Sequence, residues 1–144
     1  MNPHFTIQKI WNDDDLIELS IEVSDGKSMF LNTVYVATDA IQHLATDLAK
    51  FREQIYGGLY DIRFGEFGPE YANGALHARL HFHAHGRLFI STWQQTDFEE
   101  FTKTQVASEA KMYLKADPIS LDNFIVELKS MNTGLNDKAT LICI

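Results

Sequence analysis

The segment from Leu16 to Ser24 shows the most regular alternation of apolar and polar residues in the chain. Its apolar positions are Ile17, Leu19, Ile21 and Val23. A period of two predicts a strand with one buried face. The next two residues, Asp25-Gly26, predict a tight hairpin turn, because both tolerate the positive φ that such turns require. A two-residue turn would pair Ile21 with Phe30, and the apolar faces of the two strands would then agree.

Two other segments repeat their apolar residues at helical spacing. In residues 38–55 the apolar stripe contains Ile41, Leu44, Ala45 and Leu48. Thr38 or Asp39 can cap this helix, and Gly57-Gly58 predicts its end. A second helix is predicted from Pro118 to Met131, because proline is favoured in the first turn of a helix.

Several further segments alternate as strands do. They are residues 59–67 (LYDIRFGEF), 75–84 (ALHARLHFHA), 87–94 (RLFISTWQ), 102–116 (TKTQVASEAKMYLKA) and 139–144 (ATLICI), with an earlier strand around Phe5, Ile7 and Trp11. Strands interrupted by two helices predict an α+β fold. We expect one domain, residues 1–144, with a mostly antiparallel sheet of about seven to eight strands and both helices on one face of it.

The turn at Gly86 leaves the buried face of the following strand undecided. A two-residue turn would place Phe89 and Trp93 beside the core, whereas a three-residue turn would choose Leu88 and Ile90. Both registers suit the sequence, because residues 87–94 are apolar on both sides.

Two stretches of the chain share a common plan. YVATDAIQHLATDLAKF and YLKADPISLDNFIVELKSM match Tyr35 to Tyr113 and Asp39 to Asp117, at an offset of 78 residues. Each stretch places a strand before a short cap and a helix. The match is explained either by duplication of a strand–helix unit or by the general needs of any strand-to-helix junction.

Composition limits the class of protein. The chain has 144 residues, of which 45% are hydrophobic and 22% are charged, as is usual for a globular domain. It has no run of 18 apolar residues and no apolar leader after basic residues, so we expect neither a membrane span nor a signal peptide. Cys143 is the only cysteine, which excludes an intrachain disulfide and a cysteine zinc cage. We expect a cytoplasmic protein.

Negative charge is concentrated in the first half of the chain. The formal net charge is −8, with twelve acidic and five basic residues in 1–72 against eight and seven in 73–144. Residues 10–26 contain six acidic residues and no lysine or arginine. Such a surface repels nucleic acid and anionic membranes and attracts basic partners. The alternative is that the charge only keeps the domain soluble.

Four of the six histidines lie within residues 77–85. His77, Arg79, His81, His83 and His85 are all odd-numbered, so on a strand they share one face, opposite the apolar residues. Neighbouring side chains on that face lie about 6.6 Å apart, a spacing at which two imidazoles can bind one metal ion.

A metal site is therefore one interpretation of the histidine strand. Its ligands would be His77, His81 and His83, with Asp61 from the adjacent strand as a further candidate and Glu66 only through a bulge. The positive charge of Arg79 on the same face opposes a cation. The other readings are polar-face histidines that contact a partner, a pH-responsive contact surface and a subunit contact in a homodimer.

No motif for an enzyme is present. The sequence has no nucleophile elbow, no glycine-rich phosphate loop and no His-Glu-x-x-His helix. A nucleic-acid role would require a basic groove, which the charge balance opposes. We therefore expect a non-enzymatic protein without a cofactor.

The order of several segments resembles a known group of proteins. These segments are Trp11 with the acidic DLIELSIEVSDG, then VYVATDAIQHLATDLAKF, IRFGEFGPEYANGALHARLHF and MYLKADPISLDNFIVELKSM. They are similar to small uncharacterised bacterial proteins, some labelled as immunity proteins of the type paired with wall-associated polymorphic toxins. The resemblance covers most of the chain. It implies a non-enzymatic α+β domain that binds and blocks a cognate toxin.

The leading hypothesis is thus a small cytoplasmic binding protein with an acidic contact surface. Many toxin domains attack nucleic acid through basic clefts, which an acidic protein can block by charge complementarity. The expected contact residues are Asp13, Asp14, Asp15, Glu18 and Glu22 of the acidic hairpin, with His81 and His83. Glu18 and Glu22 are expected to point away from the core, so that their charge is available to a partner. The alternative hypothesis is a metal-binding domain or metal-dependent enzyme built on the histidine strand.

Overall fold

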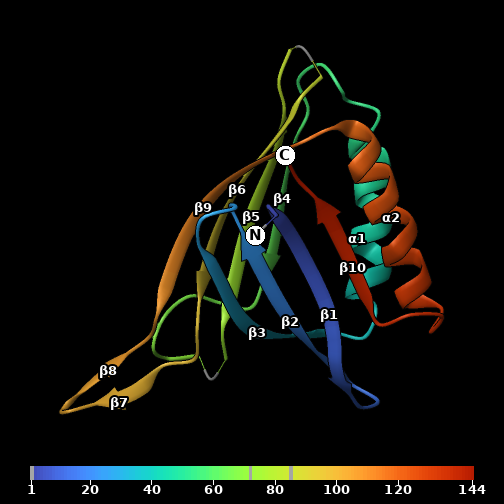
Figure 1. Ribbon diagram of the computed structural model, residues 1–144. Helices are drawn as coiled ribbons and strands as arrows, with labels where there is room; N and C mark the ends of the chain where they lie inside the picture. The colour runs from blue at the N-terminus through green and yellow to red at the C-terminus, as the bar shows by residue number, and fades with distance from the viewer. Residues whose placement is uncertain (1, 72, 85) are drawn as a thin grey trace.

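The computed structural model describes residues 2–71, 73–84 and 86–144. Within them the chain forms ten strands and two helices (Figure 1). In order, these are β1 (His4–Asn12), β2 (Leu16–Ser24), β3 (Met29–Ala37), α1 (Ala40–Phe51), β4 (Leu59–Phe64), β5 (Ala75–Phe82), β6 (Leu88–Gln95), β7 (Glu99–Phe101), β8 (Thr104–Val106), β9 (Glu109–Ala116), α2 (Pro118–Asn132) and β10 (Lys138–Ile142). In this described part, neither helix is long and apolar enough to span a membrane.

The strands form two four-stranded antiparallel sheets and one short hairpin. The first sheet has the order β10-β1-β2-β3, the second has the order β4-β5-β6-β9, and β7 pairs with β8. The predicted α+β class, antiparallel pairing and two helices are confirmed. The predicted single sheet of seven to eight strands is wrong. Alternation shows which face of a strand is buried, but it does not show which strands become neighbours.

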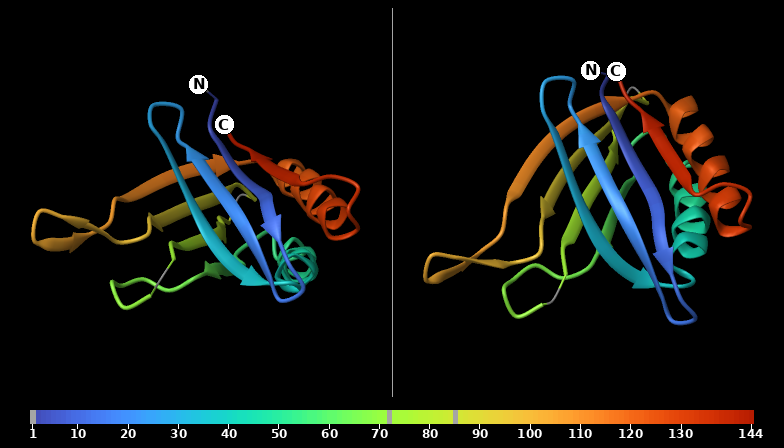
Figure 2. Two further views of the ribbon diagram at one scale, coloured as in Figure 1. Left: turned by 90° about the horizontal axis from the view of Figure 1, so that it is seen from below. Right: turned by 60° about the horizontal axis from the view of Figure 1, so that its bottom comes forward.

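Both sheets turn their apolar faces toward a shared core, and the two helices lie side by side along one flank of it (Figures 1 and 2). Phe124 of α2 packs edge-on against Phe5 of the first sheet, with ring centres 6.0 Å apart. Phe51 of α1 stacks on Phe82 of the second sheet at 4.8 Å. Each helix therefore covers a different sheet, and the Arg52–Asp122 ion pair joins the helices. The prediction that both helices lie on one face of one sheet is also wrong, because the helices cover two different sheets.

A buried polar contact joins the two sheets. Asn32 of β3 donates from Nδ2 to the carbonyl oxygens of Ala75 and Gln95, at 3.0 and 2.9 Å. Gln94 of β6 donates from Nε2 to Asn32 Oδ1 at 2.8 Å and to the Ile21 carbonyl at 3.1 Å. Side-chain amides thus replace the backbone hydrogen bonds that a continuous sheet would supply at this place.

The two halves of the chain repeat one order of elements. The first half reads β1-β2-β3-α1-β4 and the second reads β5-β6-β9-α2-β10, with the β7–β8 hairpin inserted. The last strand of each half pairs with the first strand of the other, since β4 pairs with β5 and β10 pairs with β1. The chain ends therefore lie side by side (Figure 2), and the Cys143 N–H donates to the Pro3 carbonyl. The shared plan seen in the sequence corresponds to this repeated order.

The β2–β3 connection is a four-residue loop, so the predicted two-residue turn is wrong. Val23 pairs with Phe30, and Ile21 pairs with Asn32. Asp25 Oδ1 accepts the N–H groups of Lys27 and Ser28, which widens the loop to Asp25–Ser28. The register shifts by two residues, and an even shift leaves the same side chains facing the core.

One predicted helix is shorter than expected, and one predicted strand is divided in two. Helix α1 ends at Phe51 rather than at residue 55, because the next N–H groups bond three residues back instead of four, from Glu53 to Lys50 and from Gln54 to Phe51. The strand predicted over 102–116 divides into β8 and β9. At the break, the Ser108 N–H donates to Thr96 Oγ1, and the β7–β8 hairpin leaves the sheet.

The histidine strand is extended, as predicted. In β5 the side chains of Leu76, Ala78, Leu80 and Phe82 are buried, and the alternate side chains face outward. Leu88 and Ile90 of β6 are buried while Phe89 is exposed, so the alternative with Leu88 and Ile90 beside the core is correct. The connection between β5 and β6 spans five residues, from His83 to Arg87. The predicted place of His85 on the histidine face lies outside the described residues.

Candidate functional site

The β1–β2 hairpin carries Asp13, Asp14 and Asp15 at its exposed tip. Asp13 closes the turn: its Oδ1 accepts the N–H groups of Leu16 and Asp15, both at 2.8 Å. These two hydrogen bonds, with Leu16 first, hold the pKa of Asp13 below its ordinary value. Asp13 therefore shapes the tip, and the Asp14 and Asp15 carboxylates are presented to solvent.

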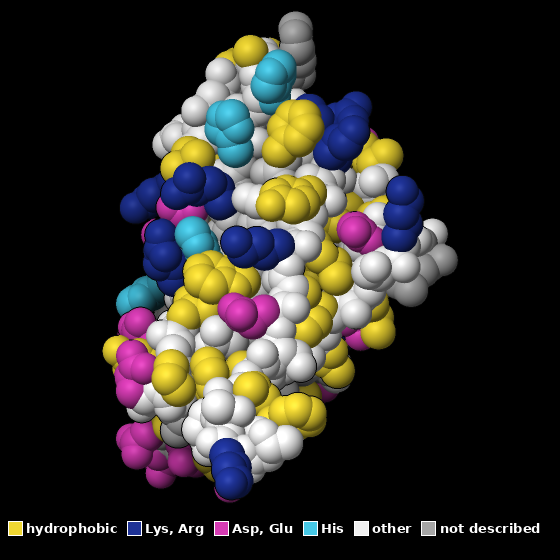
Figure 3. All heavy atoms as spheres, turned by 90° about the vertical axis from the view of Figure 1, so that its left-hand side faces the viewer, with side chains coloured by type: hydrophobic (Ala, Val, Ile, Leu, Met, Phe, Trp, Pro, Cys, Tyr) yellow, Lys and Arg dark blue, Asp and Glu magenta, His cyan; other side chains and the backbone are white. Residues whose placement is uncertain are grey.

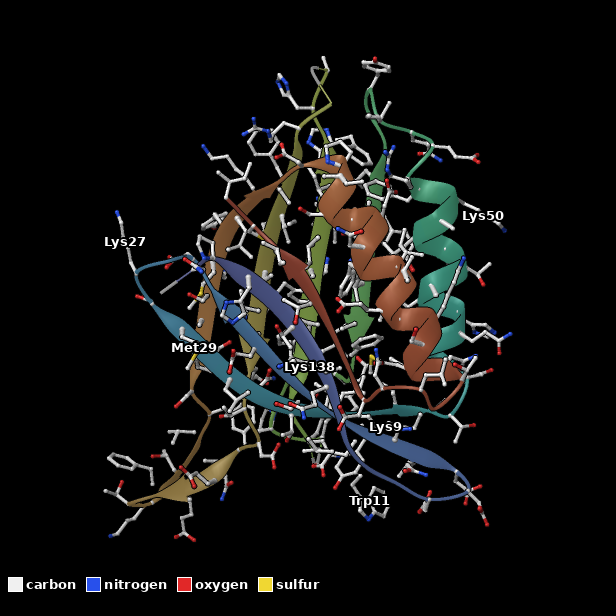
Figure 4. All side chains as sticks on the ribbon, turned by 45° about the vertical axis from the view of Figure 1, so that its right-hand side comes forward. Lys9, Trp11, Lys27, Met29, Lys50 and Lys138 are labelled. Atoms are coloured by element: carbon white, nitrogen blue, oxygen red, sulfur yellow. The ribbon has the colours of Figure 1, made fainter. Side chains whose placement is uncertain are left out.

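Next to the tip, a row of three side chains crosses the outer face of the first sheet. Glu18 of β2 pairs with Trp11 of β1 on one side and with Tyr35 of β3 on the other. The Trp11 and Tyr35 rings meet edge-to-face with centres 6.2 Å apart. Trp11 projects from the end of β1 (Figure 4), and it is 47% exposed. A large aromatic surface thus stands exposed beside carboxylates.

A second segment brings negative charge to the same place. The charge of Glu18 is the main cause that raises the pKa of Tyr35 above its ordinary value, and Asp97, which follows β6, adds to it. The fold therefore gathers acidic groups from two distant parts of the sequence around Tyr35. We call this surface the acidic end; it consists of Trp11, Asp13, Asp14, Asp15, Glu18, Tyr35 and Asp97.

Glu22 does not belong to the acidic end. It lies seven residues along β2 from Asp15, which is about 23 Å at the rise of a strand. Its Oε2 lies 2.7 Å from Nε2 of His4, and the other ring nitrogen of His4 lies 2.8 Å from the Asn2 carbonyl oxygen. Glu22 points away from the core as predicted, but its carboxylate already has a partner. The prediction that this charge is available is wrong.

The predicted contact residues His81 and His83 lie far from the acidic hairpin. His81 is on the outer face of β5, and His83 follows that strand, near the β5–β6 connection. This connection and the β1–β2 tip are at opposite ends of the molecule (Figure 1). The His83 ring meets Phe89 edge-on, with centres 5.8 Å apart. The structure therefore separates the histidines from the carboxylates with which the sequence grouped them.

Asp61 is tied to Arg79 and His77 on the outer face of the second sheet. Arg79 donates from Nε to Asp61 Oδ1 at 2.9 Å and from Nη2 to Oδ2 at 3.2 Å. His77 Nε2 lies 3.1 Å from Asp61 Oδ1. The Arg79 hydrogen bonds are the main cause that lowers the pKa of Asp61 to about 2. The carboxylate that was a further candidate ligand in the metal hypothesis thus already binds a fixed cation, Arg79.

The metal reading also lacks a converged set of ligands. Among residues 2–71, 73–84 and 86–144, no group of three or more His, Cys, Asp or Glu side chains is placed to hold a metal ion. Of the four suggested ligands, His77 and Asp61 contact each other, with His77 Nε2 3.1 Å from Asp61 Oδ1.

The rest of this face combines cations with aromatic rings. Figure 3 shows histidine, basic and hydrophobic side chains together over the upper half of this side, with acidic side chains toward its lower edge. Trp93 stacks on Phe67 at 3.9 Å, Lys111 Nζ lies 5.3 Å from the Trp93 ring centre, and the indole N–H donates to Glu109. The molecule thus separates a basic aromatic face from the acidic end.

A groove of about 460 Å³ lies beside β4. Its lining comes from Tyr35 to Ala37 of β3, from the first half of α1, and from Tyr60 to Gly65 of β4. The Tyr60 hydroxyl donates to Asp47 Oδ2 at 3.0 Å across it. Burial, followed by the contact with Asp47, raises the pKa of Tyr60 to about 12. We call this feature the α1–β4 groove; through Tyr35 it continues into the acidic end.

Sequence reasoning missed Trp11, Tyr35 and Asp97 as members of the site. The sequence indicates Trp11 only as part of an early strand, and Asp97 lies 79 residues from Glu18. Once the β1–β2–β3 register is known, Trp11, Glu18 and Tyr35 follow from pairing alone. Asp97 could not be found in this way, because its approach depends on how the two sheets cross.

Comparison of the chain with protein-family models, with curated proteins and with solved structures found no match.

Proposed function

We propose that the protein is a small non-enzymatic binding protein that holds a basic protein partner at the acidic end. The partner is expected to be a toxin domain whose basic cleft is covered by the complex. The observation that carries the proposal is the row of Trp11, Glu18 and Tyr35 beside the Asp13–Asp15 tip. It combines an exposed aromatic anchor with negative charge from two distant parts of the chain, the β1–β2 hairpin and Asp97.

Electrostatic attraction supports this proposal. Carboxylates that project from a hairpin tip speed the approach of a basic surface and orient it before contact. Asp13 keeps the tip in one shape through its two hydrogen bonds to the backbone. A contact surface that is already ordered loses less conformational entropy on binding.

Apolar contact would supply most of the affinity. Trp11, Ile10 and Leu16 are 47%, 48% and 42% exposed around the tip. Tryptophan is among the residues that most often dominate binding energy, particularly where polar groups surround it. The resemblance of the sequence to small immunity proteins suggests the same blocking role.

Growth rescue tests the proposal. The product of the gene adjacent to this chain's gene is expressed with and without this protein, and cell growth is measured. We expect the product to stop growth alone and the wild-type protein to restore it. Trp11→Ala, and separately Asp14→Asn with Asp15→Asn and Glu18→Gln, should weaken binding by about ten- to a hundredfold and abolish the rescue.

The control is Glu53→Gln, which neutralises an exposed carboxylate just after α1 and should leave the rescue intact. Asp13 is left unchanged because it closes the turn. Thermal unfolding of each variant checks that the fold is kept. Full rescue by the acidic-end variants would show that this surface is not the contact. A wild-type protein that restores no growth would contradict the blocking role.

A further inference from the structure

Strand β4 is an edge strand, and its hydrogen-bond pattern shows which groups it leaves unpaired. The Phe82 N–H donates to the Gly58 carbonyl, so Gly58 and Phe82 form a hydrogen-bonded pair. Such pairs alternate along an antiparallel ladder. Tyr60, Ile62 and Phe64 therefore bond to β5, and the N–H and C=O groups of Leu59, Asp61 and Arg63 point away from it. Within the described residues, these three N–H groups donate no hydrogen bond.

The equivalent edge in the other half of the fold is covered. Strand β10 occupies the place of β4, and its outward N–H at Thr140 donates to Glu127 Oε1 of α2 at 3.0 Å. The Ile144 N–H donates to the Lys115 carbonyl at 2.8 Å, which joins this edge to β9. When the buried residues Leu44 and Leu48 of α1 are aligned with Phe124 and Leu128 of α2, Asp47 matches Glu127. Asp47 accepts the Tyr60 hydroxyl instead of a backbone N–H of the edge strand. The β4 edge is left without the cover that the β10 edge has.

The open edge forms one wall of the α1–β4 groove, whose charge is mainly negative. Asp39 and Asp47 line its α1 side, and Arg63 lies on β4. His43 Nε2 lies 3.7 Å from Asp39 Oδ2. Asp61 also lines the groove, but Arg79 already balances its charge. At the β3 end, Tyr35 connects the groove to Glu18 and Asp97 of the acidic end.

We propose that the α1–β4 groove binds an extended, positively charged segment, which adds to the second sheet as a strand beside β4. Its backbone would bond to Leu59, Asp61 and Arg63, and its basic side chains would face Asp39 and Asp47. Exposed edge strands pair readily with extended peptides, and alternate side chains then set the specificity. The inference rests on the proposed function in one respect: the segment is taken to belong to the same basic partner.

The probe is a capped nine-residue peptide of alternating threonine and lysine, added up to millimolar concentration to the ¹⁵N-labelled protein. We expect chemical-shift changes and slower hydrogen exchange at the amides of Leu59, Asp61 and Arg63. A peptide of alternating threonine and glutamate should bind at least tenfold more weakly. The lysine peptide with N-methyl groups on alternate residues should also bind at least tenfold more weakly. Its methylated nitrogens cannot donate hydrogen bonds to the outward carbonyl groups of β4. The double variant Asp39→Asn, Asp47→Asn should bind the lysine peptide several-fold more weakly than the wild type does.

The matched control is the Asp14→Asn, Asp15→Asn variant, which should bind the lysine peptide as the wild type does. Absence of changes at the three β4 amides, or equal binding of the N-methylated peptide, would refute strand addition. Equal binding of the glutamate peptide would refute the charge preference. Changes confined to the acidic end would refute the groove inference and leave the proposed function standing. Failure of growth rescue with intact peptide binding would refute the proposed function and leave the groove inference standing.

Discussion

At the scale of single residues, a side chain's role depends on the partners that the fold gives it. Asp61 is expected from the sequence to be a metal ligand candidate, yet it holds Arg79 through two hydrogen bonds. Glu22 is expected to be available to a partner, yet it contacts His4. The residue type and the outward direction were predictable in both cases. The partner was not, because it comes from another strand.

The Asp61–Arg79 pair leads to a pH-dependent prediction. The folded-state pKa of Asp61 is about 2, below the ordinary value, so the pair adds stability at neutral pH and loses it as the pH falls toward 2. We expect Asp61→Asn to lower the free energy of unfolding by about 1 kcal/mol at pH 7, since Arg79 is half exposed and water screens the pair. Urea unfolding from pH 7 down to pH 2 should show this difference shrinking below pH 4. Asp14→Asn is the control, and an equal loss in both variants would contradict the assignment.

At the scale of elements, local patterns predicted the type of each segment better than its end or its register. The β2–β3 loop is two residues longer than predicted because Asp25 caps it, and an even shift preserves the buried face. The strand after Gly86 shows the opposite case. Its buried face could not be chosen from the sequence, because an odd change in loop length inverts it.

A substitution at Gly74, the residue before β5, tests how closely β3 approaches β5. A Cβ at this position would meet the Thr33 carbonyl oxygen and would lie 2.8 Å from that of Gln95. Because both are backbone atoms, Gly74→Ala should force β3 away from β5 and lower the free energy of unfolding by about 1–3 kcal/mol. Asn73→Ala, one residue earlier, should be close to neutral. Chemical denaturation measures both, and equal stability of the wild type and the Gly74→Ala protein would show that the approach is looser.

At the scale of the whole molecule, two sheets share one core and meet through Asn32 and Gln94. Apolar packing alone does not define the angle at which two sheets cross, whereas an amide bonded to named carbonyls does. This crossing brings Asp97 near Tyr35 and leaves β3 and β4 as separate edges. Both the acidic end and the α1–β4 groove therefore depend on it.

Replacing Asn32 tests this joint. Asn32→Leu removes two donors to backbone carbonyls and one acceptor for Gln94, so we expect a loss of about 2–4 kcal/mol in the free energy of unfolding. Thr92→Val, on the inner face of the second sheet, is a control for the loss of a buried polar group. The buried Thr92 hydroxyl has no hydrogen-bond partner among the described residues, so its removal should cost nothing. A similar loss in both variants would indicate a general packing effect rather than the amide contact.

The amino-acid sequence by itself determined the α+β class, the two helices and the face of most strands, including the outward histidines of β5. These properties depend on periodicity within one segment, which is a local property of the chain. It also indicated that the run Asp13–Asp15 lies at the surface, because consecutive aspartates are almost never buried.

Only the tertiary structure decided how strands are shared between sheets and which side chains meet. The division into two sheets and the pairing of β10 with β1 depend on contacts between residues far apart in the chain, and the charge of Asp97 acts on Tyr35 from a distant part of the sequence. A periodic pattern carries no information about its distant partner, because many pairings bury the same apolar face equally well. Packing of the complete chain selects one of them.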